Sequence, residues 1–260
     1  MLARGAEGPN VVALQRSLRA LGWQDVIVDG KFGLYTDCAV RQEQQRLDLR
    51  ADGVVGPITG RELLTAQPLL GRTAVRVRLP VTFRSQRDNR YAPSSTCNVT
   101  SFAMALSYLG VPEPRGMQLE DHLYQLITSD EGVKHLRASF PWATNVAPWT
   151  VHGMLTWVAA KMGVKSSFKT TATWDEVRAE LDQKRPVVLS AMFTGSGHIV
   201  CLSGYGGESG GAPDVLIADD PWGDWNPGYR ERDGSDRVYT RTGLEGIGCK
   251  SGQIWAHFFR

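Results

Sequence analysis

Three residues that are distant in the sequence have the types needed for nucleophilic attack on a carbonyl carbon. Cys97 lies where a polar, turn-like stretch passes into an apolar helical pattern. Unpaired backbone N–H groups and the positive end of a helix dipole favour a thiolate at such a position. His198 leads into an apolar strand, and Asp220 follows another strand. A thiol, an imidazole and a carboxylate are the parts of a cysteine nucleophile with its base and its orienting group.

The chemistry assigns a role to each of these groups. The Cys97 thiol would attack the carbonyl carbon, and His198 would accept its proton and later protonate the leaving amine. A carboxylate would hold the imidazole in the correct tautomer. Asp219 and Asp220 compete for that task, because strand alternation sends their side chains to opposite faces. We favour Asp220, and the choice stays open at this point.

Bulk composition restricts the functional class. The chain has 260 residues, is 42% hydrophobic and 22% charged, and carries a formal net charge of +2, which gives no strong field for nucleic acid. The four cysteines and five histidines show no metal-ligand spacing, so we expect no metal and no cofactor. Residues 71–90 hold six arginines against one acid, which could attract an anionic wall surface.

The first residues contain no apolar segment typical of a signal peptide, and no stretch approaches the length of a membrane span. We therefore expect the protein to be made in a cytoplasm, without a membrane span. If its target lies outside, another agent must deliver it. We also expect a monomer.

The first 66 residues predict a small three-helix bundle. Apolar residues recur at helical spacing over about 11–21, over 36–47 and again from 59. Two turns precede the second and third helices, and they match each other: Val28-Asp29-Gly30-Lys31-Phe32-Gly33 recurs as Ala51-Asp52-Gly53-Val54-Val55-Gly56. We interpret these turn residues as structural, because Asp-Gly forms a tight turn and the second Gly allows a positive φ.

These residues resemble the peptidoglycan-binding type-one domain. The resemblance is carried by Val11-x-x-Leu14-Gln15-x-x-Leu18, Asp29-Gly30-x-Phe32-Gly33 and Asp52-Gly53-x-Val55-Gly56-Pro57. The family usually has an aromatic residue before Gln where this chain has Arg41-Gln42. The resemblance implies that residues 1–66 bind bacterial peptidoglycan.

Residues 67–78 are predicted to be a basic linker and residues 79–260 a second domain. Apolar and charged residues alternate over 75–79, which predicts a strand of the second domain there. Helical patterns dominate the first half of this domain, including one from Cys97 to Gly110 and one opened by the capping box at Thr173. Strand patterns follow at 186–193, 199–205, 215–218 and 253–259. Helices followed by an antiparallel sheet define an α+β fold.

The second domain resembles the papain-like cysteine peptidases, and more closely the branch related to bacteriocin-leader peptidases. The matching residues are Ser85-Gln86-x-Asp88-Asn89, Thr96-Cys97-Asn98-x-Thr100-Ser101, Gly197-His198-x-Val200 and Asp220-Pro221-Trp222-Gly223. The family's Asp precedes Pro, which supports Asp220. The resemblance also implies that Gln86 donates an N–H toward the developing oxyanion, with the Cys97 backbone N–H as partner.

Trp222 and Trp225 follow the proposed acid closely and could line a substrate groove.

Together the two resemblances imply a peptidoglycan hydrolase that cleaves an amide in the stem peptide or cross-bridge. A wall substrate without a signal peptide resembles a bacteriophage endolysin, an antimicrobial enzyme stored in the host cytoplasm until lysis. The alternatives are an N-acetylmuramoyl-L-alanine amidase with the same triad and a non-enzymatic wall-binding protein with a degenerate peptidase fold.

Overall fold

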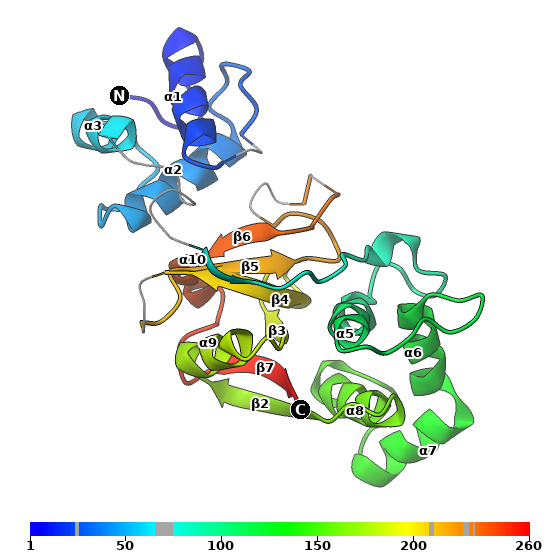
Figure 1. The fold of residues 1–260 in the computed structure, drawn as a ribbon. Helices are drawn as coiled ribbons and strands as arrows, with labels where there is room; N and C mark the ends of the chain where they lie inside the picture. Colours follow the sequence, from blue (N-terminus) through cyan, green and yellow to red (C-terminus); the bar gives the residue numbers. More distant parts are fainter. Residues whose placement is uncertain (24–25, 66–74, 208–210, 226–228, 231) are drawn as a thin grey trace. The chain divides into compact units, whose positions relative to one another are not determined.

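The chain forms two compact units. The structure is a computed structural model that describes residues 1–23, 26–65, 75–207, 211–225, 229–230 and 232–260. One unit contains Met1–Val75 and Asp224–Arg232, and the other contains Arg76–Gly223 and Asp233–Arg260. The relative positions of these parts are not determined, so each unit is described by itself (Figure 1).

The N-terminal unit contains the three predicted helices. They are α1 (Pro9–Ala20), α2 (Leu34–Arg46) and α3 (Pro57–Thr65). Their apolar faces enclose a small core in which Val11, Leu18 and Val40 are fully buried. The predicted three-helix bundle is therefore confirmed.

The two matching turns of this unit are held by the same hydrogen bonds. In the first turn, Gln15 Nε2 donates to Asp29 Oδ1 over 2.9 Å, and the Gly30 N–H donates to Gln15 Oε1 over 2.9 Å. The second turn repeats both bonds with the set Gln44, Asp52 and Gly53. In each turn a buried glutamine side chain both donates to the turn and accepts from it, and these bonds tie the helix that carries the glutamine to the loop that follows. Both turns thus serve the bundle itself.

The second unit is built on an antiparallel sheet of seven strands. The strands are β1 (Val75–Arg78), β2 (Ser166–Ala172), β3 (Val187–Ala191), β4 (His198–Gly206), β5 (Val215–Asp219), β6 (Arg237–Thr240) and β7 (Ile254–Phe259). Their order is β2-β7-β3-β4-β5-β6, and β1 pairs with β4 beside this path. Strand β4 is buried along its whole length, which places its first residue, His198, in the interior.

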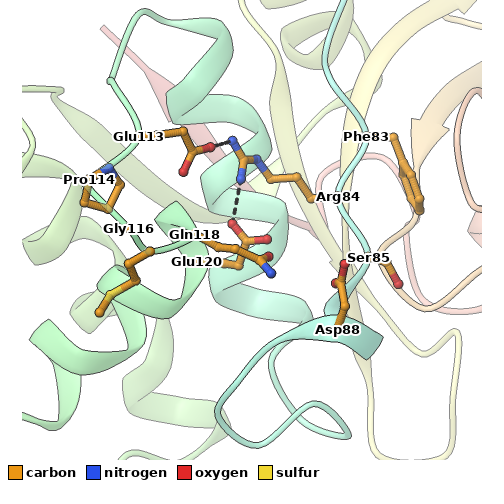
Figure 2. Close-up of a pocket in the computed structure, with 10 residues that line it drawn as sticks. Phe83, Arg84, Ser85, Asp88, Glu113, Pro114, Gly116, Gln118 and Glu120 are labelled. Atoms are coloured by element: carbon orange, nitrogen blue, oxygen red, sulfur yellow. Dashed lines mark hydrogen bonds and ion pairs between the residues drawn. The ribbon is translucent and has the colours of Figure 1, made fainter.

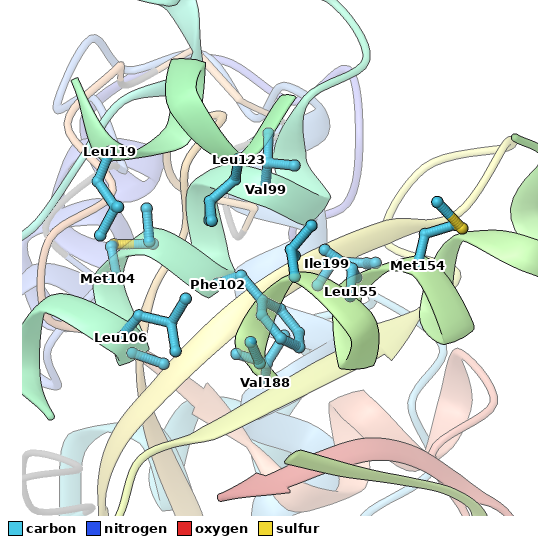
Figure 3. Close-up of a cluster of buried hydrophobic side chains, with 14 of the residues drawn as sticks. Val99, Phe102, Met104, Leu106, Leu119, Leu123, Met154, Leu155, Val188 and Ile199 are labelled. Carbon is cyan, nitrogen blue, oxygen red and sulfur yellow. The ribbon is translucent and has the colours of Figure 1, made fainter. Parts of the chain in front are cut away.

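The α-helices of this unit are α5 (Cys97–Tyr108), α6 (Leu119–Thr128), α7 (Asp130–Ser139), α8 (Pro148–Lys161), α9 (Trp174–Asp182) and α10 (Arg241–Gly246). Helices α5, α8, α9 and α10 pack against the sheet, and α6 and α7 pack against α5 and α8 (Figure 1). Helix α5 is central: its Phe102 meets Leu155 of α8 and Val188 of β3 in one apolar cluster (Figure 3). A helix that is apolar on nearly all sides is held firmly by its surroundings. The residue at its start, Cys97, is therefore fixed relative to the sheet.

The predicted α+β class is confirmed, and several elements differ from the prediction. Helices α7 and α10 and strands β2 and β6 were not predicted, and β2 interrupts the expected order of helices followed by strands. The strand predicted from the alternation over 75–79 is confirmed as β1, whereas residues 67–74 of the predicted linker lie outside the described part of the chain. Among the described helices, none is long and apolar enough to cross a membrane.

Candidate active site

Cys97 is the first residue of α5 and is partly exposed. Thr96 precedes it with a non-helical backbone, and the first helical bond runs from the Thr100 N–H to the Thr96 carbonyl over 3.0 Å. The first N–H groups of a helix have no partner within it, so they face any group placed at this end. In the other three cysteines (Cys38, Cys201 and Cys249) burial raises the pKa of the thiol. Cys97 alone combines partial exposure with a helix N-terminus.

His198 meets Cys97 from the sheet. It begins β4 after Gly197, whose φ of +84° turns the chain into the strand in a conformation that glycine adopts without strain. Its Nε2 lies 2.7 Å from Asp220 Oδ1, and its other ring nitrogen is left for the Cys97 side chain. Burial opposes protonation of this imidazole, but the charge and hydrogen bond of Asp220, with those of Cys97, outweigh it and raise the pKa of His198 to about 10.

Asp220 is fully buried and its carboxylate is well satisfied. Oδ1 accepts from His198 and from the Trp222 N–H, at 2.7 and 3.0 Å, and Oδ2 accepts from the Tyr239 hydroxyl at 3.0 Å. Charged groups are tolerated in an interior only with partners of this kind. The backbone of Asp220 is closely packed against Gly234, because a Cβ on Gly234 would lie 1.9 Å from the Asp220 backbone carbonyl oxygen.

Asp219 points elsewhere. Its Oδ1 accepts from the Asp236 N–H over 3.2 Å, and burial raises the pKa of its carboxyl to about 6. It is the last residue of β5, and Asp220 follows immediately. The two aspartates thus have different environments, and only Asp220 reaches His198.

Gln86 starts the short 3₁₀ helix η1 (Gln86–Asp88) and is 2% exposed. Its backbone N–H donates to the Pro221 carbonyl over 2.9 Å, which ties it to the loop after Asp220. Its Nε2 donates one proton to the Pro93 carbonyl over 2.9 Å, and an amide nitrogen carries two. Donation of the second proton to an oxyanion stays a prediction.

The two tryptophans have different positions. The indole of Trp222 carries the Arg87 guanidinium 3.6 Å from its ring centroid, so this face is occupied. Trp225 lies in Asp224–Arg232, which belongs to the N-terminal unit and is not placed relative to the site. A groove role stays a prediction for both residues.

A pocket of about 710 Å³ lies beside the Gln86 turn (Figure 2). Ser85 and Asp88, on either side of Gln86, belong to its lining, whereas Cys97 and His198 do not. Arg84 crosses it to Glu113 and Glu120.

Several arginines of the basic segment 71–90 also make internal contacts. Arg78 pairs with Asp236, Arg84 with two glutamates, and Arg87 stacks on Trp222. Arg72 lies outside the described residues. Attraction of this segment to an anionic wall stays a prediction.

A helix-borne thiol facing an imidazole and a carboxylate on an antiparallel sheet defines a papain-like domain. Comparison with known families gives the same class. The chain belongs to the Peptidase_C39 like family, whose sequence profile matches residues 78–246. A second profile, that of the peptidoglycan binding domain family, matches residues 7–63. The predicted combination of the two families is confirmed.

Two curated proteins share a short region with the chain. A spore cortex-lytic enzyme of Halalkalibacterium halodurans is 40% identical over 57 residues, covering 22% of this chain and 17% of that protein. The N-acetylmuramoyl-L-alanine amidase CwlM of Mycobacterium tuberculosis is 45% identical over 56 residues, covering 22% of this chain and 14% of the amidase. Both matches are much shorter than the 78–246 region that the peptidase family profile covers. The predicted bacteriophage origin stays a prediction.

Two solved structures are similar over most of the chain. One is a double glycine motif protease from an AMS/PCAT transporter in complex with its leader peptide, at 16% identity and a TM-score of 0.41, covering 72% of this chain and 96% of that one. The other is UfSP from C. elegans, at 11% identity and a TM-score of 0.41, covering 75% and 35%.

Proposed function

We propose that this protein is a peptidoglycan hydrolase that cleaves an amide bond of the stem peptide or cross-bridge with Cys97, His198 and Asp220. The observation that carries the proposal is the convergence of these groups: His198 interacts with the Cys97 side chain and, 2.7 Å away, with Asp220. The peptidoglycan binding family of residues 7–63 supplies the substrate class. The names of the two curated relatives, a cortex-lytic enzyme and an amidase, agree with it.

The first half of the reaction forms a thioester. The Cys97 thiolate attacks the amide carbon, and the carbonyl oxygen becomes an oxyanion. The Cys97 backbone N–H and the free proton of Gln86 Nε2 stabilise that charge, and such a donor typically contributes about 3–4 kcal/mol. His198, held as imidazolium by Asp220, then protonates the leaving amine.

The second half releases the acid. His198, now neutral, takes a proton from water as the water attacks the thioester, and the sulfur leaves as a thiolate that restores the ion pair. Asp220 keeps the imidazole in one orientation through both steps, because three donors hold its own carboxylate still.

The N-terminal unit would act by proximity. A module that holds the enzyme on the wall raises the local concentration of scissile bonds without a new contact at the active site. Removal of residues 1–66 should therefore slow clearing of intact walls and leave cleavage of soluble stem peptides intact.

The decisive experiment treats purified walls with the full chain and with Cys97→Ala, and analyses the products by mass spectrometry. New amino termini inside the peptide would identify an endopeptidase, and free lactyl groups an amidase acting through the same triad. Products formed equally by Cys97→Ala would contradict the proposal. Unchanged walls with both proteins, while both bind, would support the non-enzymatic alternative.

A further inference from the structure

The Asn89 side chain forms hydrogen bonds with the first turn of α5, the helix that begins at Cys97. Asn89 is 6% exposed, and its Nδ2 donates to Thr96 Oγ1 and to Thr100 Oγ1, each over 2.9 Å. Thr96 immediately precedes the thiol, and Thr100 lies nearly one helical turn beyond it. A single amide therefore holds the chain on both sides of Cys97.

The orientation of this amide follows from the two hydroxyls. Thr96 donates its proton to the Ala92 carbonyl over 3.2 Å, and Thr100 donates its proton to the Thr96 carbonyl over 2.8 Å. Both hydroxyls therefore offer only lone pairs to Asn89, and the amide must present its NH₂ group. Asn89 Oδ1 is left buried without a partner in the described chain.

The turn that precedes Asn89 is fixed to the sheet side of the site. The Gln86 N–H donates to the Pro221 carbonyl over 2.9 Å, and Arg87 Nε donates to the Trp222 carbonyl over 2.9 Å. The Arg87 guanidinium also stacks on Trp222. The Asn89 N–H, which donates to the Gln86 carbonyl over 3.3 Å, continues the same turn. The loop after β5, the η1 turn and the start of α5 thus form one connected path.

We infer that Asn89 is a positioning residue that sets the start of α5 relative to Gln86, so that the Cys97 sulfur, the Cys97 N–H and the Gln86 amide face one carbonyl group. The inference rests on the proposed function, because it takes Cys97 as the nucleophile. Two oxyanion donors on different segments are effective only in a fixed relative position. A shift of about 1 Å at such a site can lower the rate by about a hundredfold.

The test uses the full-length chain and substitutions that change hydrogen bonding with little change of shape. Asn89→Ala removes both donors. Thr100→Val removes one acceptor at nearly constant volume, and Thr100→Ser restores it. Thr150→Val is the matched control, since Thr150 is equally buried at the start of α8 and accepts from the Ala147 N–H over 2.9 Å rather than from Asn89.

Two measurements distinguish positioning from a merely structural role. The first is the split between kcat and KM on soluble stem peptides. The second is the pH profile of Cys97 alkylation by iodoacetamide, followed on the Cys97 peptide by mass spectrometry. We expect Asn89→Ala and Thr100→Val to lower kcat roughly ten- to a hundredfold with little change in KM, and to move the alkylation profile to higher pH. Thr100→Ser should recover most of the loss.

The inference fails if Asn89→Ala and Thr100→Val keep the wild-type kcat and alkylation profile, or if Thr150→Val loses activity to the same extent. If Asn89→Ala does not fold, the Thr100 pair decides alone. The alkylation profile needs no wall substrate. If the wild-type chain leaves peptidoglycan intact, the proposed function is rejected. A shift of the alkylation profile in Asn89→Ala and Thr100→Val would still support the positioning role of Asn89.

Discussion

Replacement of Asp220 by Asn tests the electrostatic basis of the site. The substitution keeps the shape of the side chain and removes the charge that holds His198 as imidazolium. Without that charge, burial of the ring is no longer offset, and the pKa of His198 should fall from about 10 to its ordinary value near 6.5 or below. The loss corresponds to roughly 3–5 kcal/mol of stabilisation of the charged form, the range found when a buried pair is broken.

The raised pKa of His198 determines how the contribution of the His198–Asp220 pair to stability changes with pH. In the wild type the pair contributes stability that is fully present below about pH 6.5 and is lost as the pH rises through about 10. The difference in unfolding free energy between wild type and Asp220→Asn should therefore be largest below pH 6.5 and should shrink toward pH 10. Cys97 should also lose its alkylation rate at neutral pH, because a neutral imidazole no longer stabilises the thiolate.

The assays are NMR titration of the His198 ring, denaturant unfolding at several pH values, and Cys97 alkylation. Asp219→Asn is the matched control, because this neighbouring buried carboxyl contacts Asp236 and not His198. It should leave the His198 titration in place. A His198 pKa that stays near 10 in Asp220→Asn, or a stability difference that does not change with pH, would refute the ion-pair explanation.

Three further predictions concern other parts of the chain. Gly234→Ala should lower kcat by about tenfold or more, measured on soluble stem peptides, because its Cβ would collide with the Asp220 carbonyl and displace the carboxylate. His152→Phe should reduce the loss of stability between pH 6.5 and 4 in denaturant titrations. Burial lowers the pKa of His152 to about 4, so protonation of the unfolded chain destabilises the wild type as the pH falls through this window. Burial also lowers the pKa of His257, so part of the acid sensitivity remains, whereas fully unchanged acid sensitivity would count against this. Gln44→Leu should lower the unfolding free energy of the N-terminal unit by about 1–3 kcal/mol, seen as an earlier calorimetric transition, because the Gly53 N–H loses its acceptor; an unshifted transition would contradict a structural role for the turn.

Much of the helix and sheet framework could be predicted from local patterns. The helix at Cys97 has an apolar run with a glycine just beyond its end, and the structure ends α5 at Tyr108 with Gly110 at a φ of +93°. Strand β2 was missed because its sequence, Ser166–Ala172, lacks an alternating apolar pattern and is held by pairing with β7. Helix α7 was missed because its sequence, Asp130–Ser139, contains few apolar residues from which a helical period could be recognised.

The supporting contacts of the site could not be predicted in the same way. Tyr239 donates to Asp220 from a strand 19 residues further along the chain, and Gly234 lies against the Asp220 carbonyl. Neither residue belongs to a motif, and their partners are defined only when β5 and β6 pair. Asn89 belongs to the same motif as Gln86, but its hydrogen bonds with the Thr96 and Thr100 hydroxyls depend on the geometry of the turn. Contacts between segments depend on register, which local propensity does not encode.

The choice between Asp219 and Asp220 shows what tertiary structure adds. Both residues are buried, and they are adjacent at the end of β5, so composition and hydropathy cannot separate them. The sheet separates them by direction. Asp220 turns toward His198, Tyr239 and the Trp222 N–H, whereas burial raises the pKa of Asp219 to about 6. A carboxyl whose charged form is disfavoured by burial would be a poor partner for an imidazolium, whereas the Asp220 carboxylate is held by three donors. The direct contact of Asp220 with His198 therefore agrees with the choice that the motif favoured, and the other two donors show how that carboxylate is held in place.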